Sequence, residues 1–540
     1  MLFTLHRYVF RELLRVFVLA AVALTLILSL GSILQPIQEY GVGPRQVVHL
    51  MGYFLPITLT FVLPMAALFA GALVYGRLAN DNELDACRAS GISLPTMTYP
   101  GLALAIMVAM ANLVLSFYVM PVFVHRAEKS FKANAKQILF RNIERRRYYE
   151  LPPDGRYLIY ADKANMHNDT LLGAVVTEMN KNNQIEKIIM AEEAKVIFNM
   201  HDTFSEVQII AYKPTQMGPE GEGGAELGSV TREVGSLLGD EINFKKIDEM
   251  RRIKADLMQF FPIAQQAREM YGQLLIELLA QDILNSKFQI LNSKFPGGTG
   301  YELLGEPNSV KFTARQCRVQ GAEVELSDNV VVTEYQTDSK RPLRTLSCPA
   351  ASLHLEGDKL TPKLTMDVRS AQDAGSGQLI MRYIIRGLIP PPAVEARVNE
   401  FKTESGSLKT EKLARPLSEI RGLDPSDDLA GMQGRLERLI RITFAEIKAE
   451  IHSRLVFGMG CVPMILIGIG LGIIKKGGHL LSAFGASCVP AAVLIVCIMS
   501  GKQLTQNLNA QTISGIAVMW MGLGFLALVT LGIYARLLRH

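Results

Sequence analysis

The stretch YFLPITLTFVLPMAALFAGALVY, residues 53–75, contains no charged residue, and the polar segment GRLANDNELDACRASGISL, residues 76–94, follows it directly. A helix that rises about 1.5 Å per residue needs roughly 20 residues to cross a hydrocarbon core of about 30 Å. The uncharged stretch meets that length. It therefore predicts a membrane-spanning helix that ends in a short polar hairpin.

Five further stretches repeat this pattern, two near the beginning of the chain and three near its end. An ionisable side chain at the middle of a bilayer costs several kcal/mol, and none occurs in them. Six such stretches favour six transmembrane helices in two groups of three over buried core helices. The first stretch exceeds the apolar core of a signal peptide, so we expect a retained anchor. The five stretches are residues 16–34, 99–121, 455–474, 480–499 and 513–534.

The short loops predict the orientation, because Lys and Arg near helix ends are retained on the cytoplasmic side. Both termini and the two cationic hairpins would then be cytoplasmic, in a multi-pass protein of the bacterial inner membrane. The net charge of +5 largely reflects these flanks rather than a nucleic-acid surface. The residues used are Arg7, Arg11, Arg15, Arg77, Arg88, Lys475, Lys476, Arg536 and Arg539.

The chain thus divides into residues 1–121, with three spans and the hairpin 76–94, a periplasmic region 122–453, and residues 454–540 with three more spans. Runs of β-branched residues separated by Asn, Asp and Gly predict antiparallel strands in the middle region. The runs are residues 157–161, 172–179, 185–191, 194–199, 310–314, 322–326, 330–335 and 351–355, with a turn at Ser327-Asp328-Asn329.

A segment at about residues 215–305 separates the two strand blocks. It begins with a Gly-rich stretch and continues with a polar, helix-forming sequence. Apolar residues from Ile247 to Phe260 recur at helical spacing until Pro262, where we expect the helix to break. We therefore predict that this region is a helical insertion.

Cys317 and Cys348 would lie in the oxidising periplasm. They could form a disulfide or remain two buried thiols, and the sequence does not decide between these alternatives.

The sequence lacks the signatures of a self-powered carrier or an enzyme. It contains no GxxxxGK[ST] phosphate loop, no HExxH and no CxxC, and its spans carry no ionisable group for proton or sodium coupling. We therefore predict no metal site, no catalytic residue and no directly bound cofactor. A partner would supply the energy.

The hairpin carries the most specific polar pattern. Asn80 or Asp81 could cap a short helix bearing Glu83, Asp85 and Arg88, and Gly91 could end it. A short helix held between two spans can dock into a groove on a cytoplasmic ATPase. The alternative is a merely polar turn.

Three features together resemble the LptF/LptG family of lipopolysaccharide export permeases: Leu63-Pro64, the pattern GRLxxDNELxAxRASGIS at residues 76–93, and GIGLGI at residues 468–473. The resemblance implies a permease subunit that uses the ATP hydrolysis of an LptB-like ATPase. It also implies a second such permease, or a second copy, that completes a transmembrane cavity. A periplasmic β-jellyroll would pass lipopolysaccharide to an LptC/LptA-like bridge.

Carried onto this chain, the resemblance makes Glu83 the acidic contact to the ATPase, with Asp81, Asp85 and Arg88 beside it in the coupling helix. Some family members have lysines near the outer end of the first span. Here Gln35, Gln38 and Glu39 occupy that region, and Arg45 is the nearest cation for a lipid headgroup.

We therefore expect an α-helical membrane protein with six transmembrane helices and a large periplasmic, β-rich, jellyroll-like domain that carries a helical insertion. A further strand block, VELSDNVVVTEY at residues 324–335, means that the region could contain either one enlarged jellyroll or two jellyroll units. The expected function is extraction of lipopolysaccharide or a related glycolipid. A membrane-anchored periplasmic assembly or scaffold factor is the alternative, and an intramembrane enzyme is disfavoured.

Overall fold

The computed structural model divides into two compact units, residues 1–252 with 442–540, and residues 253–441. The residues it describes are 2–40, 44–151, 157–179, 185–200, 205–218, 221–224, 227–234, 241–291, 300–337, 342–356, 363–403, 407–414, 425–474, 480–507 and 512–539.

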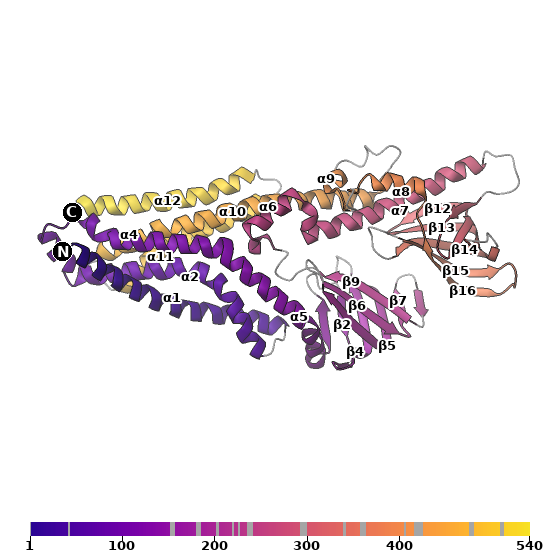
Figure 1. Ribbon diagram of the computed structural model, residues 1–540, viewed down its shortest axis with the longest axis horizontal. Coiled ribbons are helices and arrows are strands. Elements are labelled where there is room, and N and C mark those ends of the chain that lie inside the picture. Colours follow the sequence, from indigo (N-terminus) through magenta and orange to yellow (C-terminus); the bar gives the residue numbers. More distant parts are fainter. Residues whose placement is uncertain are drawn as a thin grey trace. The chain divides into compact units, whose positions relative to one another are not determined.

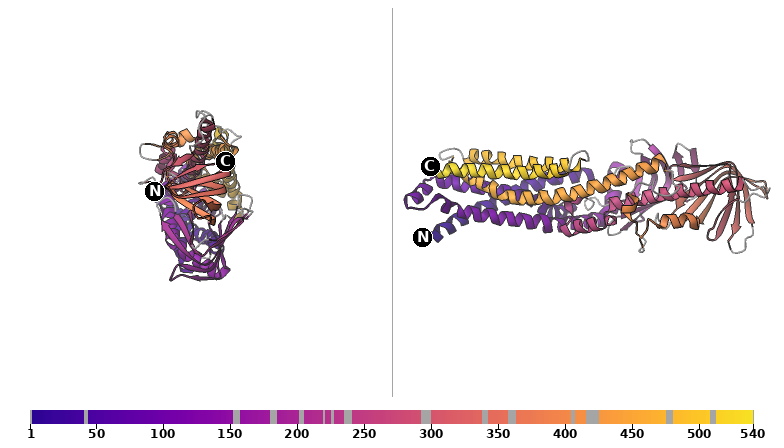
Figure 2. Two further views of the ribbon diagram at one scale, coloured as in Figure 1. Left: turned by 90° about the vertical axis from the view of Figure 1, so that its right-hand side faces the viewer. Right: turned by 90° about the horizontal axis from the view of Figure 1, so that it is seen from above.

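The described part of the chain contains six helices that are long and apolar enough to cross a membrane, as the uncharged stretches predicted. The spans belong to α1 (Leu2–Tyr40), α2 (Pro44–Asn80), α4 (Leu94–Val114), α10 (Asp427–Ile474), α11 (Leu480–Gln506) and α12 (Thr512–Arg539). The first turns of α1 and the last turns of α12 lie at the same end of the bundle (Figures 1 and 2).

The third span continues beyond α4 without a break. A π-helical segment, η1 (Leu115–Val119), leads into α5 (Met120–Arg146), whose second residue is Pro121. Proline has no N–H to donate to the preceding turn, and the helix widens at that point. The far end of α5 then packs Leu139, Phe140 and Ile143 against the first β-sheet.

The first sheet is antiparallel, with the order β1-β2-β4-β5-β6-β9 and side branches β3, β7 and β8. Two predicted strands, 185–191 and 194–199, form one long strand instead, because Glu192 and Glu193 continue the extended backbone. The strands are β1 (Tyr148–Leu151), β2 (Tyr157–Tyr160), β3 (Lys163–Asn165), β4 (Thr170–Met179), β5 (Ile185–Met200), β6 (Ser205–Tyr212), β7 (Thr215–Gly218), β8 (Gly221–Gly224) and β9 (Leu227–Val234).

Helices follow the first sheet within the segment expected to be an insertion, although β7 to β9 at its start pair into the sheet. Pro262 was predicted to break a helix, but it lies in the first turn of α7, where a missing N–H costs little. The break occurs earlier, at Asp256, whose carboxylate accepts from the Met258 N–H. The elements are η2 (Ile242–Phe244), α6 (Ile247–Ala255), η3 (Leu257–Gln259) and α7 (Phe261–Leu291).

The second sheet is also antiparallel, with the order β10-β11-β13-β14-β15-β16 and β12 paired to β13. Ile276, Leu279 and Ile283 of α7 belong to its hydrophobic core. The elements are β10 (Tyr301–Leu303), β11 (Asn308–Thr313), β12 (Gln316–Gln320), β13 (Glu323–Gln336), β14 (Pro342–Glu356), β15 (Lys363–Asp373) and β16 (Leu379–Leu388), followed by α8 (Pro392–Asn399) and α9 (Thr410–Leu413).

The turn predicted at residues 327–329 is a β-bulge within β13. Both halves of this strand pair with β14, and the register shifts between Ser327 and Val330. Asp328 and Asn329 have φ angles of 66° and 60°. These two residue types tolerate the left-handed conformation, so the same pair that signals a turn also permits a bulge.

Cys317 and Cys348 lie buried in the core of the second sheet, and no disulfide joins them. The Cys348 Sγ lies 3.7 Å from the carbonyl oxygen of Val330. Burial raises the pKa of Cys348 to about 11, because the thiolate is disfavoured away from water. Of the two alternatives left open, the structure contains the pair of buried thiols.

Candidate functional site

The polar hairpin folds as a seven-residue helix, α3 (Glu83–Ala89). Asn80 and Asp81 do not cap it: Asn80 is the last residue of α2, and the Asp81 N–H closes the final turn of α2 on the Arg77 carbonyl at 2.9 Å. The capping position falls to Asn82, which has a left-handed φ of 58°. Gly91 ends the hairpin helix as predicted, with φ +83° and its N–H on the Arg88 carbonyl.

One apolar side chain anchors α3 to the helix bundle. Leu84 is only 5% exposed and belongs to a core cluster with Val9 of α1, Tyr75 of α2 and Met97 of α4. Asp81, Glu83, Asp85 and Arg88 are all exposed. The hairpin therefore presents charged groups outward from a fixed base. Glu83 and Asp85 lie in the first helical turn, where the helix dipole favours negative charge.

The N-terminal turns of α1 brace the same hairpin. The Arg77 Nη1 atom lies 3.0 Å from the Glu12 Oε1 atom, and the His6 Nε2 atom lies 2.9 Å from the Thr96 carbonyl oxygen. A small pocket between these elements is lined by His6 and Tyr8 of α1 and by Glu83 and Cys87 of α3, among others. Sequence reasoning missed Glu12 and His6, since nothing in the local pattern connects them with residues so distant in the chain.

The two spans that flank the hairpin are joined by a buried hydrogen bond. The Tyr75 hydroxyl of α2 donates to the Met97 carbonyl of α4 at 2.9 Å. Tyr75 is fully buried. The base of the hairpin is thus packed against all three spans of the first group, α1, α2 and α4.

Glycines of α10 extend this connection to the second group of spans. A Cβ atom at Gly468 would lie 2.8 Å from the Leu68 carbonyl oxygen of α2, and one at Gly472 would lie 2.6 Å from the Ala72 carbonyl oxygen. Only glycine allows this approach, since a methyl group would overlap the facing backbone. The GIGLGI motif thus has a packing role beside the span that leads into the hairpin.

Residues 7–219 match the model of the family described as lipopolysaccharide export system permease LptF/LptG. Over these residues the chain is similar to the LptF/LptG family. The match confirms the resemblance first noted in the hairpin, and it extends from α1 into the first sheet. No curated protein matches the chain.

The LptF/LptG match includes Asp81, Glu83, Asp85 and Arg88 and ends before the second sheet. Together with the six apolar helices, the match fits a multi-pass membrane protein, and the family that it matches consists of transporter components. Arg45 also falls within the match; it lies in α2, but its side chain is outside the described part. Among the described residues, no group of three His, Cys, Asp or Glu side chains could hold a metal ion.

Proposed function

We propose that this chain is a permease subunit of an ATP-driven exporter that extracts lipopolysaccharide or a related glycolipid from the bacterial inner membrane. The LptF/LptG match carries the proposal. The six apolar helices and the anchored, outward-facing charged helix agree with it. The protein would itself bind no nucleotide, because its sequence contains no phosphate loop.

Helix α3 is the proposed docking element for an LptB-like ATPase. Glu83 would make the acidic contact, with Asp81, Asp85 and Arg88 around it. Its base is rigid, since Leu84 is buried and Arg77 is paired with Glu12. Movement of the ATPase would therefore displace α1, α2 and α4 as a unit rather than bend a flexible loop.

In this proposal both termini and the hairpin are cytoplasmic, and the β-rich region is periplasmic. The two sheets would act as jellyroll-like modules that pass the lipid to an LptC/LptA-like bridge protein. A second LptF/LptG-type subunit, or a second copy, would complete the cavity. Helix α1 offers a surface for such a partner or for lipid, because Leu19, Val22 and Ile27 are more than half exposed.

Depletion of the protein from growing cells tests this function. Lipopolysaccharide should accumulate in the inner membrane and disappear from newly made outer membrane, as measured by fractionation and labelling of the lipid. Normal delivery of labelled lipopolysaccharide would contradict the export function. Defective assembly of envelope proteins with normal lipid delivery would instead favour the anchored scaffold.

A further inference from the structure

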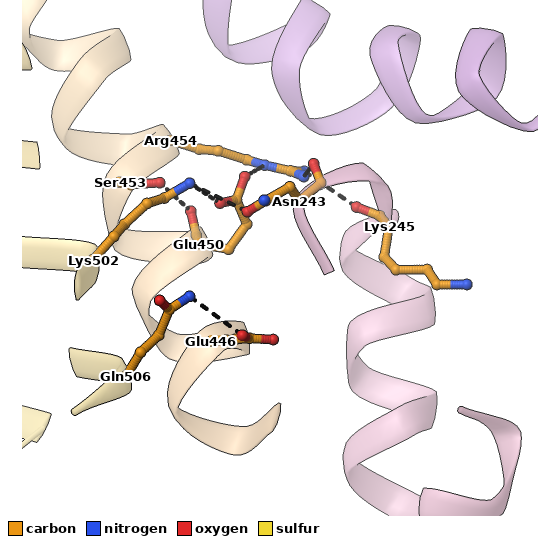
Figure 3. Close-up of polar contacts among 8 residues, drawn as sticks. All are labelled: Asn243, Lys245, Glu446, Glu450, Ser453, Arg454, Lys502 and Gln506. Atoms are coloured by element: carbon orange, nitrogen blue, oxygen red, sulfur yellow. Dashed lines mark hydrogen bonds and ion pairs between the residues drawn. The ribbon is translucent and has the colours of Figure 1, made fainter. Parts of the chain in front are cut away.

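A buried ionic cluster connects α10 and α11 with the segment that contains Asn243 and Lys245 (Figure 3). Arg454 directly precedes the uncharged stretch 455–474, and Lys502 closely follows the uncharged stretch 480–499. The Arg454 side chain is 3% exposed and that of Glu450 is 7% exposed. Charges so deeply buried need partners, and these residues form a connected set.

Arg454 uses all three nitrogens of its guanidinium group. Its Nε atom donates to the Glu450 Oε1 atom at 2.7 Å, its Nη2 atom to the Asn243 carbonyl at 2.7 Å, and its Nη1 atom to the Lys245 carbonyl at 3.2 Å. The two carbonyls belong to the linker, residues 242–249, which lies between the first sheet and the rest of α6 in the chain. A lysine offers a single ammonium group and could not reproduce this planar fork.

The cluster also joins helices from both groups of spans. The Arg454 guanidinium lies 5.5 Å from the ring centre of Phe117, which is part of the π-helical segment of the third span. The second oxygen of Glu450 pairs with Lys502 of α11, and Lys502 lies 3.3 Å from the Asn243 Oδ1 atom. Arg454 and its partners thus connect the third, fourth and fifth spans with the linker.

A second contact fastens the other end of the linker. The His125 Nε2 atom of α5 lies 3.3 Å from the Glu249 Oε1 atom. Burial favours the neutral carboxyl, but hydrogen bonds from His125 and the Lys246 N–H lower the pKa of Glu249 to about 2. Glu249 is therefore ionised at neutral pH. The linker is held by the third span's continuation at one end and by the fourth and fifth spans at the other.

We propose that Arg454 is a positioning residue that transmits rearrangement of the two groups of spans to the linker and so to the first sheet. This inference rests on the proposed export function, because it assigns a route from the spans to the region that receives the lipid. Glu450 and Lys502 hold the Arg454 guanidinium and Asn243 in register. Neither the hairpin nor the family match contains these residues.

The test combines a measurement on the purified protein with one on the working transporter. Hydrogen exchange of residues 242–249 is compared in wild type, Arg454→Met, Arg454→Lys and the exposed control Lys448→Met, all in the same detergent. Arg454→Met should raise exchange in the linker by about tenfold or more, since it removes charge-assisted hydrogen bonds. Arg454→Lys should give a smaller increase, and Lys448→Met should match wild type.

The second measurement uses the complex with its ATPase. Arg454→Lys should retain ATP hydrolysis but lose most lipid release, whereas Lys448→Met should retain both. Unchanged linker exchange in Arg454→Met, or loosened exchange with normal lipid release in Arg454→Lys, would overturn the inference. If wild type itself released no lipid, the export function would fail, while the exchange data would still decide whether Arg454 holds the linker.

Discussion

Arg77 of α2 and Glu12 of α1 form an ion pair with an Nη1–Oε1 distance of 3.0 Å, which fastens the first span to the start of the hairpin. Both side chains are partly exposed, so the pair should contribute less than about 1 kcal/mol to the free energy of unfolding. A double-mutant cycle with Glu12→Gln and Arg77→Gln should give a coupling energy of a few tenths of a kcal/mol that weakens in high salt. Strict additivity of the two substitutions would show that the pair does not hold the span.

The close crossing of α2 and α10 predicts strong sensitivity at Gly472. A methyl group there would lie 2.6 Å from the Ala72 carbonyl oxygen, so Gly472→Ala should destabilise the protein by about 1–3 kcal/mol. Gly532→Ala is the matched control, because its Cβ would meet nothing within 4 Å. Thermal unfolding in detergent should separate the two variants. Equal melting temperatures would refute the close crossing.

Because Leu84 anchors the hairpin, its truncation should loosen α3 locally. Leu84→Ala removes a side chain that is 5% exposed and should cost about 2–4 kcal/mol of hairpin stability, while Leu84→Met should be nearly neutral. Maleimide labelling of the neighbouring Cys87 reports the change, measured with the other cysteines replaced. Labelling should be faster in Leu84→Ala than in wild type. An unchanged rate would mean that Leu84 does not anchor α3.

The buried thiol of Cys348 should make the free energy of unfolding of the second sheet depend on pH. Its pKa is raised from 9.0 to about 11, so the unfolded chain loses this proton first as the pH rises. Its contribution to stability is therefore fully present below pH 9 and is lost between pH 9 and about 11. Replacement of Cys348 by Ala should flatten the decline in unfolding free energy over that range. The same decline in both proteins would exclude the thiol as its cause.

The sequence was sufficient for features that depend on local pattern. Uncharged length predicted the six helices, and Gly91 predicted the end of α3 because its φ of +83° suits glycine. Predictions were wrong where one sequence pattern is compatible with two local structures. Asp328 and Asn329 suit a bulge as well as a turn, and Pro262 suits the first turn of a helix as well as its end.

Contacts between distant segments lay beyond sequence reasoning. The Arg454 guanidinium donates hydrogen bonds to the backbone carbonyls of Asn243 and Lys245. Because every residue has a backbone carbonyl, such contacts cannot be predicted from residue type. Glu12 gave no sign that it faces Arg77. The glycines of GIGLGI were noticed only through resemblance, and their reason became visible when α2 was placed against them.

The most direct test of the central claim is affinity purification of the protein from gently solubilised membranes, with partners identified by mass spectrometry. Wild type is compared with Glu83→Arg and with Glu144→Arg, a charge reversal at an exposed position of α5. Wild type and Glu144→Arg should retain a cytoplasmic ATPase, and Glu83→Arg should lose it. Retention of the ATPase by Glu83→Arg at the wild-type level, or recovery of no ATPase with wild type, would contradict it.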